Sequence, residues 1–143
     1  MADVSLSGLS VLIVEDETLL RKRLVASLER IGAETTAVGD LESAREQLRQ
    51  AGFDFALLDV NLPDGLGPDL LRDGAIPQGT GVVVMTANAD ITGAVEAMKL
   101  GALDYLAKPF EPAEMSLVVA RARRAKQNRR LQECKRRPKS AAG

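Results

Sequence analysis

Five side chains in this sequence have the chemistry needed to bind a small anion together with a cation. Asp59 directly follows an apolar run, and an ionised carboxylate beside a core is unfavourable unless another group pairs with it. The chain offers an acidic pair, Glu15 and Asp16, a hydroxyl at Thr86 and an amine at Lys108. Neighbouring carboxylates repel one another, and a divalent cation resolves that repulsion. These residue types favour a metal-assisted site that accepts a phosphoryl group, with a carboxylate as the nucleophile.

The ligand types restrict the choice of metal. The sequence contains no His and one Cys, Cys134, so His-based ligands and His acid/base catalysis are excluded. Carboxylate oxygens are hard ligands and favour Mg²⁺, with Mn²⁺ as an alternative. Lys108 would add a positive charge and Thr86 a hydroxyl donor for the oxygens of a tetrahedral anion.

Short apolar runs that alternate with amphipathic segments must position these groups. Five strands separated by five helices predict an α/β domain with a parallel sheet, in which the apolar first, third and fourth strands are central. Asp40 is expected to cap the second helix. The expected strands cover residues 11–14, 35–38, the run ending at Asp59, 81–86 and 103–106, and the expected helices lie near 18–31, 41–51, 68–73, 91–98 and 112 to the early 130s.

All the candidate groups follow strands of this predicted sheet. Ligands of open parallel α/β sheets bind at the carboxyl ends of the strands. Glu15 and Asp16 end the first strand, Asp59 the third, Thr86 the fourth, and Lys108 the fifth. We therefore expect them to meet at one edge of the sheet.

Each of these residues also has a structural alternative. Glu15 or Asp16 could merely favour the positive N-terminal end of the next helix. Asp59 could be a loop acid that accepts hydrogen bonds from turn amides, and Thr86 could cap the next segment. Lys108 taken alone has the properties of a surface lysine.

Composition and charge set the remaining limits. The 143 residues fit one domain, 45% of them are hydrophobic and 27% charged, and aromatic residues are scarce, which disfavours a base-stacking nucleic-acid surface. Residues 1–120 carry nine Lys/Arg and nineteen Asp/Glu, whereas residues 121–143 carry ten Lys/Arg and one Glu. The basic tail is interpreted as a solvated helix face that leads into a linker, with DNA, RNA or another anion as the alternative ligand. No membrane span or signal peptide is recognised, and the single Cys favours a cytoplasmic location.

Four motifs in order resemble a known family. Glu15-Asp16, Asp59 with Pro63 and Gly65 behind it, Thr86-Ala87 and Lys108-Pro109-Phe110 resemble the receiver (CheY-like) domain of two-component response regulators over residues 9–125. The segment MTANADITGAVEAMKLGALDYLAKPF is similar to receivers of the NtrC type. The resemblance implies a flavodoxin-like (βα)5 three-layer sandwich with a five-stranded parallel sheet in the order 2-1-3-4-5.

The resemblance also implies a role for each site residue. Asp59 would accept a phosphoryl group from a phosphohistidine on a sensor histidine kinase or phosphotransfer protein. Asp16, Asp59 and the backbone carbonyl of Asn61 would bind Mg²⁺, and Glu15 would act mainly through a metal-bound water. The remaining roles are as follows: Lys108 would neutralise phosphoryl charge and precede a cis proline, Thr86 and Tyr105 would switch together, and Asn61 and Asn88 would tune hydrolysis of the acyl phosphate.

The expected organisation is a receiver domain at residues 1–125 and a basic helix extension with a linker or tail at residues 126–143, without an output domain. As a receiver, the chain would hydrolyse its own aspartyl phosphate slowly and would not turn over an external substrate. Phosphorylation would switch the face formed by the fourth helix, fifth strand and fifth helix, favouring a homodimer or controlling a transcriptional output domain, through which alone DNA would be bound. The stripe Met115, Val118, Ala122 and Ala125 could instead form a coiled-coil seam.

Three alternative functions remain. The chain could be a stand-alone receiver that acts by protein contact, or a phosphorylation-independent scaffold. A Mg²⁺-dependent phosphohydrolase of the haloacid-dehalogenase type also uses an Asp nucleophile. In that family, however, the nucleophile ends the first strand and a second Asp follows two residues later, whereas here Asp59 ends the third strand and Asn61 follows it.

Overall fold

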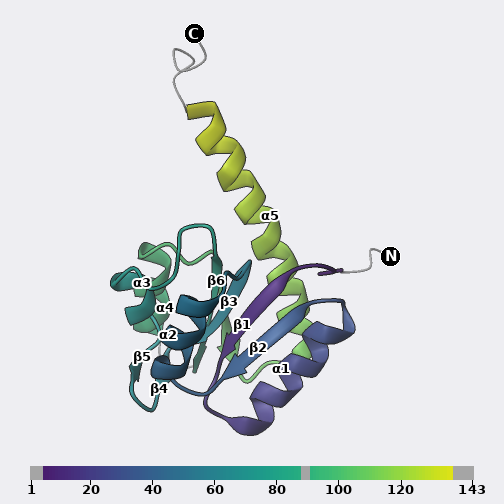
Figure 1. Ribbon diagram of the computed structural model, residues 1–143, viewed down its shortest axis with the longest axis vertical. Helices are drawn as coiled ribbons and strands as arrows, with labels where there is room; N and C mark the ends of the chain where they lie inside the picture. The colour runs from purple at the N-terminus through teal and green to yellow at the C-terminus, as the bar shows by residue number, and fades with distance from the viewer. Residues whose placement is uncertain (1–4, 88–90, 137–143) are drawn as a thin grey trace.

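The computed structural model describes residues 5–87 and 91–136. The strands of the main sheet alternate with helices along the chain, as predicted, and the last helix extends well past the sheet (Figure 1). The elements are β1 (Ser10–Val14), α1 (Thr18–Arg30), β2 (Glu34–Val38), α2 (Leu41–Gln50), β3 (Phe55–Asp59), β4 (Asn61–Leu62), β5 (Gly65–Leu66), α3 (Asp69–Arg72), β6 (Gly81–Ala87), α4 (Ile91–Lys99), β7 (Asp104–Lys108) and α5 (Pro112–Arg136).

The main sheet has five parallel strands in the order β2-β1-β3-β6-β7. Counted along the main sheet, this is the predicted order 2-1-3-4-5, so the flavodoxin-like fold is confirmed. The side chains of β1, β3 and β6 are almost all buried, whereas β2 and β7, the edge strands, contain only partly buried and exposed positions. Central strands covered on both faces must be apolar throughout, which explains the unbroken Val, Leu and Ile runs.

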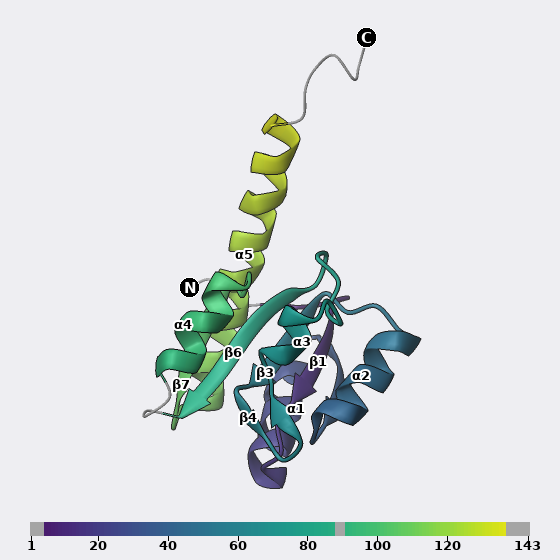
Figure 2. The same cartoon turned by 90° about the vertical axis from the view of Figure 1, so that its left-hand side faces the viewer.

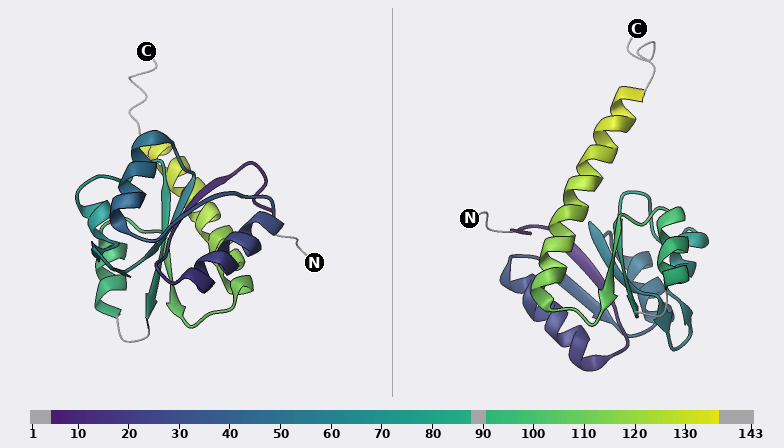
Figure 3. Two further views of the ribbon diagram at one scale, coloured as in Figure 1. Left: turned by 60° about the horizontal axis from the view of Figure 1, so that its bottom comes forward. Right: turned by 180° about the vertical axis from the view of Figure 1, so that it is seen from behind.

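Helices cover both faces of the sheet and make three layers (Figures 1 and 3). One core contains Leu12, Leu58 and Val84 of the sheet together with apolar side chains of α2, α3 and α4. The second core, on the opposite face, contains Ile13 and Leu57 with apolar side chains of α1 and α5. Alternate residues of each strand supply the two cores, as the period of two in a strand requires.

Two features of the strand pattern differ from the prediction. A two-stranded antiparallel hairpin, β4–β5, follows β3, where no further strands were expected. The last strand of the sheet runs from Asp104 to Lys108 rather than over residues 103–106, so Lys108 itself is part of the strand. The capping role of Asp40 is confirmed, because its Oδ1 accepts a hydrogen bond of 2.7 Å from the Ser43 amide.

The proposed coiled-coil seam on α5 is wrong for most of its residues. Met115, Val118 and Ala122 are buried in the core between α5 and the sheet. A periodic apolar stripe has the same sequence pattern whether it packs on the chain's own sheet or on a partner helix. In this chain the stripe packs on the chain's own sheet.

Three basic residues of α5 fasten the helix to the amino-terminal edge of the sheet. Arg123 donates to the Ser5 carbonyl (3.0 Å), Lys126 to the Asp54 carbonyl (3.0 Å), and Arg129 to the carbonyl of residue 101 (3.4 Å). Their spacing of three residues places them on one face of the helix. The second half of α5 therefore leaves the domain at the edge opposite the carboxyl ends of the strands (Figure 2). Among the described residues, no helix combines the length and apolar character that crossing a bilayer requires.

Candidate functional site

Three acidic side chains converge where β1 and β3 end. One carboxylate oxygen from each of Glu15, Asp16 and Asp59 lies within 4.8 Å of the others. Glu15 has no exposed surface and Asp59 is 5% exposed, whereas Asp16 is exposed. The convergence follows from the sheet, because β1 and β3 are adjacent and parallel with Val14 opposite Leu58. The predicted meeting of these acids is confirmed.

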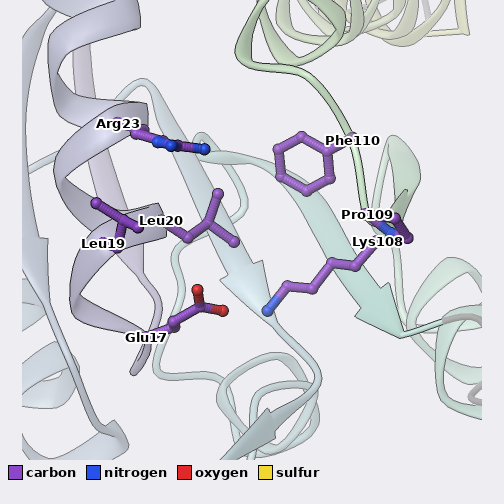
Figure 4. Close-up of a pocket in the computed structure, with 7 residues that line it drawn as sticks. All are labelled: Glu17, Leu19, Leu20, Arg23, Lys108, Pro109 and Phe110. Carbon is purple, nitrogen blue, oxygen red and sulfur yellow. The ribbon is translucent and has the colours of Figure 1, made fainter.

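Lys108 reaches these acids from the end of β7. Its Nζ lies 2.6 Å from Glu15 Oε1 and 2.9 Å from Asp59 Oδ2. Figure 4 shows the side chain extending from its strand across the sheet edge toward α1. Burial opposes the charged amine, but the contacts with Glu15 and Asp59 outweigh this effect and raise the pKa of Lys108. The amine therefore stays protonated and bridges two carboxylates.

Glu15 is the member of the cluster whose ionised form is most disfavoured by burial. Burial raises the pKa of its carboxyl from 4.5 to about 7, although Lys108 and the Glu17 amide, which donates to Oε2 at 3.0 Å, favour the ionised form. The Asp59 carboxylate raises it further. Oε1 is buried and, among the described residues, accepts no hydrogen bond of good geometry despite its contact with Nζ. A buried carboxylate oxygen in this state has capacity for another cation.

The donor set fits a divalent metal ion with hard-ligand preference. Three carboxylates offer oxygen ligands within a small volume, and in the described part of the chain the buried Glu15 Oε1 is neutralised only by its ion pair with Lys108. Mg²⁺ is usually bound by one or two carboxylates and keeps several waters, which the exposed side of Asp16 would admit. The residues therefore fit the predicted Mg²⁺ or Mn²⁺.

Thr86 and Tyr105 occupy different surroundings. Thr86 is 3% exposed near the end of β6, one residue beyond the partner of Asp59 in the strand register, and its hydroxyl donates to the Ala87 carbonyl at 3.2 Å. Tyr105 is 48% exposed and lines a pocket against α4 with Val95 and Met98. The structure thus places the threonine at the site edge and the tyrosine on an open face.

The Asn61 amide donates to Asp59 Oδ1 at 3.3 Å, so the residue after next is folded back toward the acid. Asn88, the second residue expected to tune hydrolysis, lies outside the described residues. The peptide bond between Lys108 and Pro109 is cis, as the resemblance implied.

Sequence reasoning missed two residues that shape the site. Arg21 of α1 donates from Nη1 to the carbonyls of Glu15 (2.8 Å) and Asp16 (3.4 Å), which orients the acidic loop. A Cβ atom at Gly67 would lie 2.0 Å from the Asp59 carbonyl oxygen, so only glycine fits there. The glycine pair at 65 and 67 was a visible signal, whereas nothing in the sequence marks the arginine.

A pocket of about 390 Å³ lies beside the site, between α1 and the segment that follows β7 (Figure 4). Leu19, Leu20 and Phe110 give it an apolar wall, and Lys108 stands at its inner side. Leu19 is 58% exposed, so the apolar wall of the pocket is open to solvent on the side of α1.

Comparison with known proteins agrees with the geometry. Residues 11–120 match the model of the response regulator receiver domain. The response regulator protein PilR of Pseudomonas aeruginosa is 37% identical over 121 residues, which cover 83% of this chain and 27% of PilR. The DNA-binding response regulator MtrA of Mycobacterium tuberculosis is 36% identical over 115 residues, or 80% of this chain and 50% of MtrA. The chain thus spans a quarter to a half of these relatives.

Solved structures give the same result. NtrX from Brucella abortus, crystallised in complex with ADP, superimposes with a TM-score of 0.80 at 28% identity, over 91% of this chain and 30% of NtrX. Full-length FixJ from B. japonicum gives 0.78 at 29% identity, over 90% of this chain and 64% of FixJ. The chain belongs to the response regulator receiver domain family, whose members are signalling domains of two-component systems and not turnover enzymes.

Proposed function

We propose that Asp59 is the phosphoacceptor of this receiver domain. The single observation that carries the proposal is the placement of Lys108 Nζ, which contacts both Asp59 Oδ2 and Glu15 Oε1 beside the acidic cluster. An amine in this position can neutralise oxygens of a phosphoryl group bonded to Asp59. The phosphohydrolase alternative is disfavoured, because Asp59 ends the third strand of the main sheet and the residue two positions later is Asn61, not a second Asp.

The donor in the proposed reaction is a phosphohistidine on a sensor histidine kinase or a phosphotransfer protein. An oxygen of Asp59 attacks phosphorus, the bond from phosphorus to the imidazole nitrogen breaks, and the imidazole leaves with the electron pair. The product is an acyl phosphate on Asp59. Asp16, Asp59 and the Asn61 carbonyl would hold Mg²⁺, with Glu15 acting mainly through water, and the ion would supply positive charge beside the transferred group.

The chain's own residues orient the reactants and respond to the product. Lys108 holds Asp59 in place through its ion pair before transfer and can follow the new negative charge afterwards. Phosphorylation adds close to two negative charges, which would draw the Thr86 hydroxyl away from the Ala87 carbonyl. Tyr105 would move with it. We infer that Asn61 and Asn88 set the slow rate at which water hydrolyses the acyl phosphate.

Intact mass after incubation with acetyl phosphate and Mg²⁺ tests the proposal. The wild-type chain should gain one phosphoryl group and Asp59→Asn should gain none. Asp54→Asn is a matched control, because Asp54 lies just before the opposite end of the same strand and its carboxylate accepts a hydrogen bond from the Ser10 amide. A phosphoryl group on Asp59→Asn would contradict the assignment. So would the lack of one on the wild type or on Asp54→Asn.

The kinase is proposed to dock on the apolar pocket formed by Leu19, Leu20 and Phe110. This pocket shares Lys108 with the acidic site, so a partner seated there brings its phosphohistidine close to Asp59. The exposed Leu19 would be covered in the complex. Small donors such as acetyl phosphate do not need this contact, whereas a kinase does.

The output face is proposed to lie over α4, β7 and α5. Val95, Met98 and Tyr105 are 47%, 40% and 48% exposed and form an apolar patch there. Burying such a patch against a second copy would stabilise a dimer of phosphorylated chains. A DNA-binding function, which the name of MtrA gives for that protein, would require an output domain outside the residues described above.

Sedimentation velocity with and without beryllofluoride and Mg²⁺ tests the output face. The wild-type chain should shift toward a dimer when beryllofluoride is added, and Val95→Asp should remain a monomer. Leu19→Asp places the same charge on an exposed apolar position of α1, and we expect it to dimerise normally. Dimerisation of Val95→Asp as strong as that of the wild type would show that the patch is not the interface.

A further inference from the structure

The hairpin that follows the phosphoacceptor strand is fixed at its tip to a distant helix. β4 and β5 are joined by Pro63 and Asp64, with Leu62 opposite Gly65. The Asp64 carboxylate accepts hydrogen bonds from two backbone amides at the start of α2, from Leu41 (2.8 Å) and from Glu42 (3.0 Å). The pKa of Asp64 is lowered, chiefly by the Leu41 amide, so the group is ionised at neutral pH.

This contact completes the capping of α2. The first amides of a helix have no partner within the helix and need acceptors from outside. Asp40 accepts from the Ser43 amide in the usual N-cap arrangement, and Asp64 takes the two amides before it. The negative charge also lies at the positive end of the helix dipole. The cap of α2 is therefore built from two acids that are 24 positions apart in the sequence.

The base of the same hairpin is fixed to the phosphoacceptor itself. The Gly67 amide donates to the Val60 carbonyl at 2.8 Å, and the Val60 amide donates to the Met85 carbonyl of β6 at 3.0 Å. Gly67 packs so closely on Asp59 that a Cβ there would lie 2.0 Å from the Asp59 carbonyl oxygen. At the tip, a Cβ at Gly65 would lie 2.7 Å from Leu41 Cδ1.

Asn61 lies between these two anchors, as the first residue of β4. Its carbonyl is the backbone ligand assigned to Mg²⁺ in the proposed function, on which this inference rests. A backbone ligand cannot be oriented by a rotamer of its own, so its direction depends on the segment that carries it. We propose that Asp64 is a positioning residue for the metal site: by capping α2 from the hairpin tip, it holds the segment that presents the Asn61 carbonyl to the cation.

Mg²⁺ affinity measured by calorimetry, without any phosphoryl donor, tests this role. Asp64→Ala should raise the dissociation constant about tenfold, comparable to the smallest effects of removing a residue that orients a metal ligand, because Asp64 acts on the segment and not on the ligand directly. The amide resonances of residues 60 and 61 should also shift in the metal-free protein. Asp40→Ala is the matched control: it removes the other acid of the same cap, whose hydrogen bond goes to the Ser43 amide of α2, and we expect its Mg²⁺ affinity to match the wild type.

Phosphorylation kinetics give a second readout. With acetyl phosphate as the donor, Asp64→Ala should require about tenfold more Mg²⁺ for half-maximal rate and reach the wild-type rate within about twofold at saturating Mg²⁺. Asp64→Asn keeps one acceptor oxygen, so the Mg²⁺ concentration that it needs should lie between those of the wild type and Asp64→Ala. This variant replaces Asp64→Ala in both experiments if Asp64→Ala does not fold.

The outcomes separate the positioning role from the proposed function. If the wild-type chain does not bind Mg²⁺, the proposed function fails. If the wild type binds Mg²⁺ but the Asp64 variants and Asp40→Ala all bind it with the wild-type affinity, Asp64 only stabilises α2 and the positioning role is refuted. Equal loss of affinity in Asp64→Ala and Asp40→Ala would also refute it, because the effect would then come from the helix and not from the hairpin.

Discussion

Replacement of Glu15 by Gln should stabilise the metal-free domain at alkaline pH. Burial raises the pKa of this carboxyl from 4.5 to about 7 in the folded state. A group with a raised folded pKa contributes its full stability below its unfolded pKa and loses that contribution as the pH rises through the folded value. In the wild type the loss therefore develops between about pH 4.5 and pH 7, whereas a glutamine at position 15 does not titrate.

The size of the effect follows from the two pKa values. Each pKa unit corresponds to about 1.4 kcal/mol, so the contribution that is lost by pH 8 amounts to about 3 kcal/mol. The glutamine introduces an opposing cost at every pH, because its NH₂ group replaces Oε2, which accepts the Glu17 amide. A lost hydrogen bond of this kind costs about 1 kcal/mol. We expect Glu15→Gln to match the wild type near pH 5 and to exceed it by about 2 kcal/mol at pH 8.

Urea denaturation in EDTA at pH 5, 6.5 and 8 measures the difference directly, since a shift of the midpoint at constant slope reports stability. Glu17→Gln removes the same charge from an exposed neighbour, and we expect it to stay within about 0.5 kcal/mol of the wild type at each pH. A Glu15→Gln difference that does not change with pH would refute the reasoning, because it would mean that residue 15 is already ionised without cost in the fold.

Two further predictions concern the frame of the site. Gly67→Ala should destabilise the domain by roughly 3 kcal/mol or more, because its Cβ would overlap the Asp59 carbonyl and force a shift of the segment after β3, and chemical denaturation measures this. Lys126→Met should lower stability by about 1 kcal/mol, because it removes the hydrogen bond from Nζ to the Asp54 carbonyl and the contact of Nζ with the Phe55 ring, whose centroid is 5.0 Å away. Thermal unfolding measures this effect, and an unchanged midpoint would contradict it.

The sheet and the position of the acids could be predicted because both follow from local patterns. Unbroken apolar runs identified the central strands, and the rule that parallel strands share their carboxyl edge brought Asp59 to Glu15 and Lys108. Asp40 was recognised because an N-cap lies next to the helix that it caps. Each of these inferences uses residues that are close in sequence or a rule of topology.

The contacts that sequence reasoning missed all depend on three-dimensional placement. Asp64 was given no role, because its partners on α2 are more than 20 positions away in the sequence. Arg21 contacts carbonyls in the acidic loop, and an arginine on a helix surface carries no sign of such a role. The apolar stripe that includes Met115 was left open to a partner helix, because periodicity alone does not say which surface covers it.

Anomalous diffraction from crystals grown with Mn²⁺ tests most directly whether the acids form a cation site next to the phosphoacceptor. We predict one strong peak in the described part of the domain, with carboxylate oxygens of Asp16 and Asp59 and the carbonyl oxygen of Asn61 as ligands at about 2.0–2.3 Å. An ion bound elsewhere would contradict the proposed site. So would a structure at millimolar Mn²⁺ in which no ion is bound and Lys108 still pairs with Glu15 and Asp59.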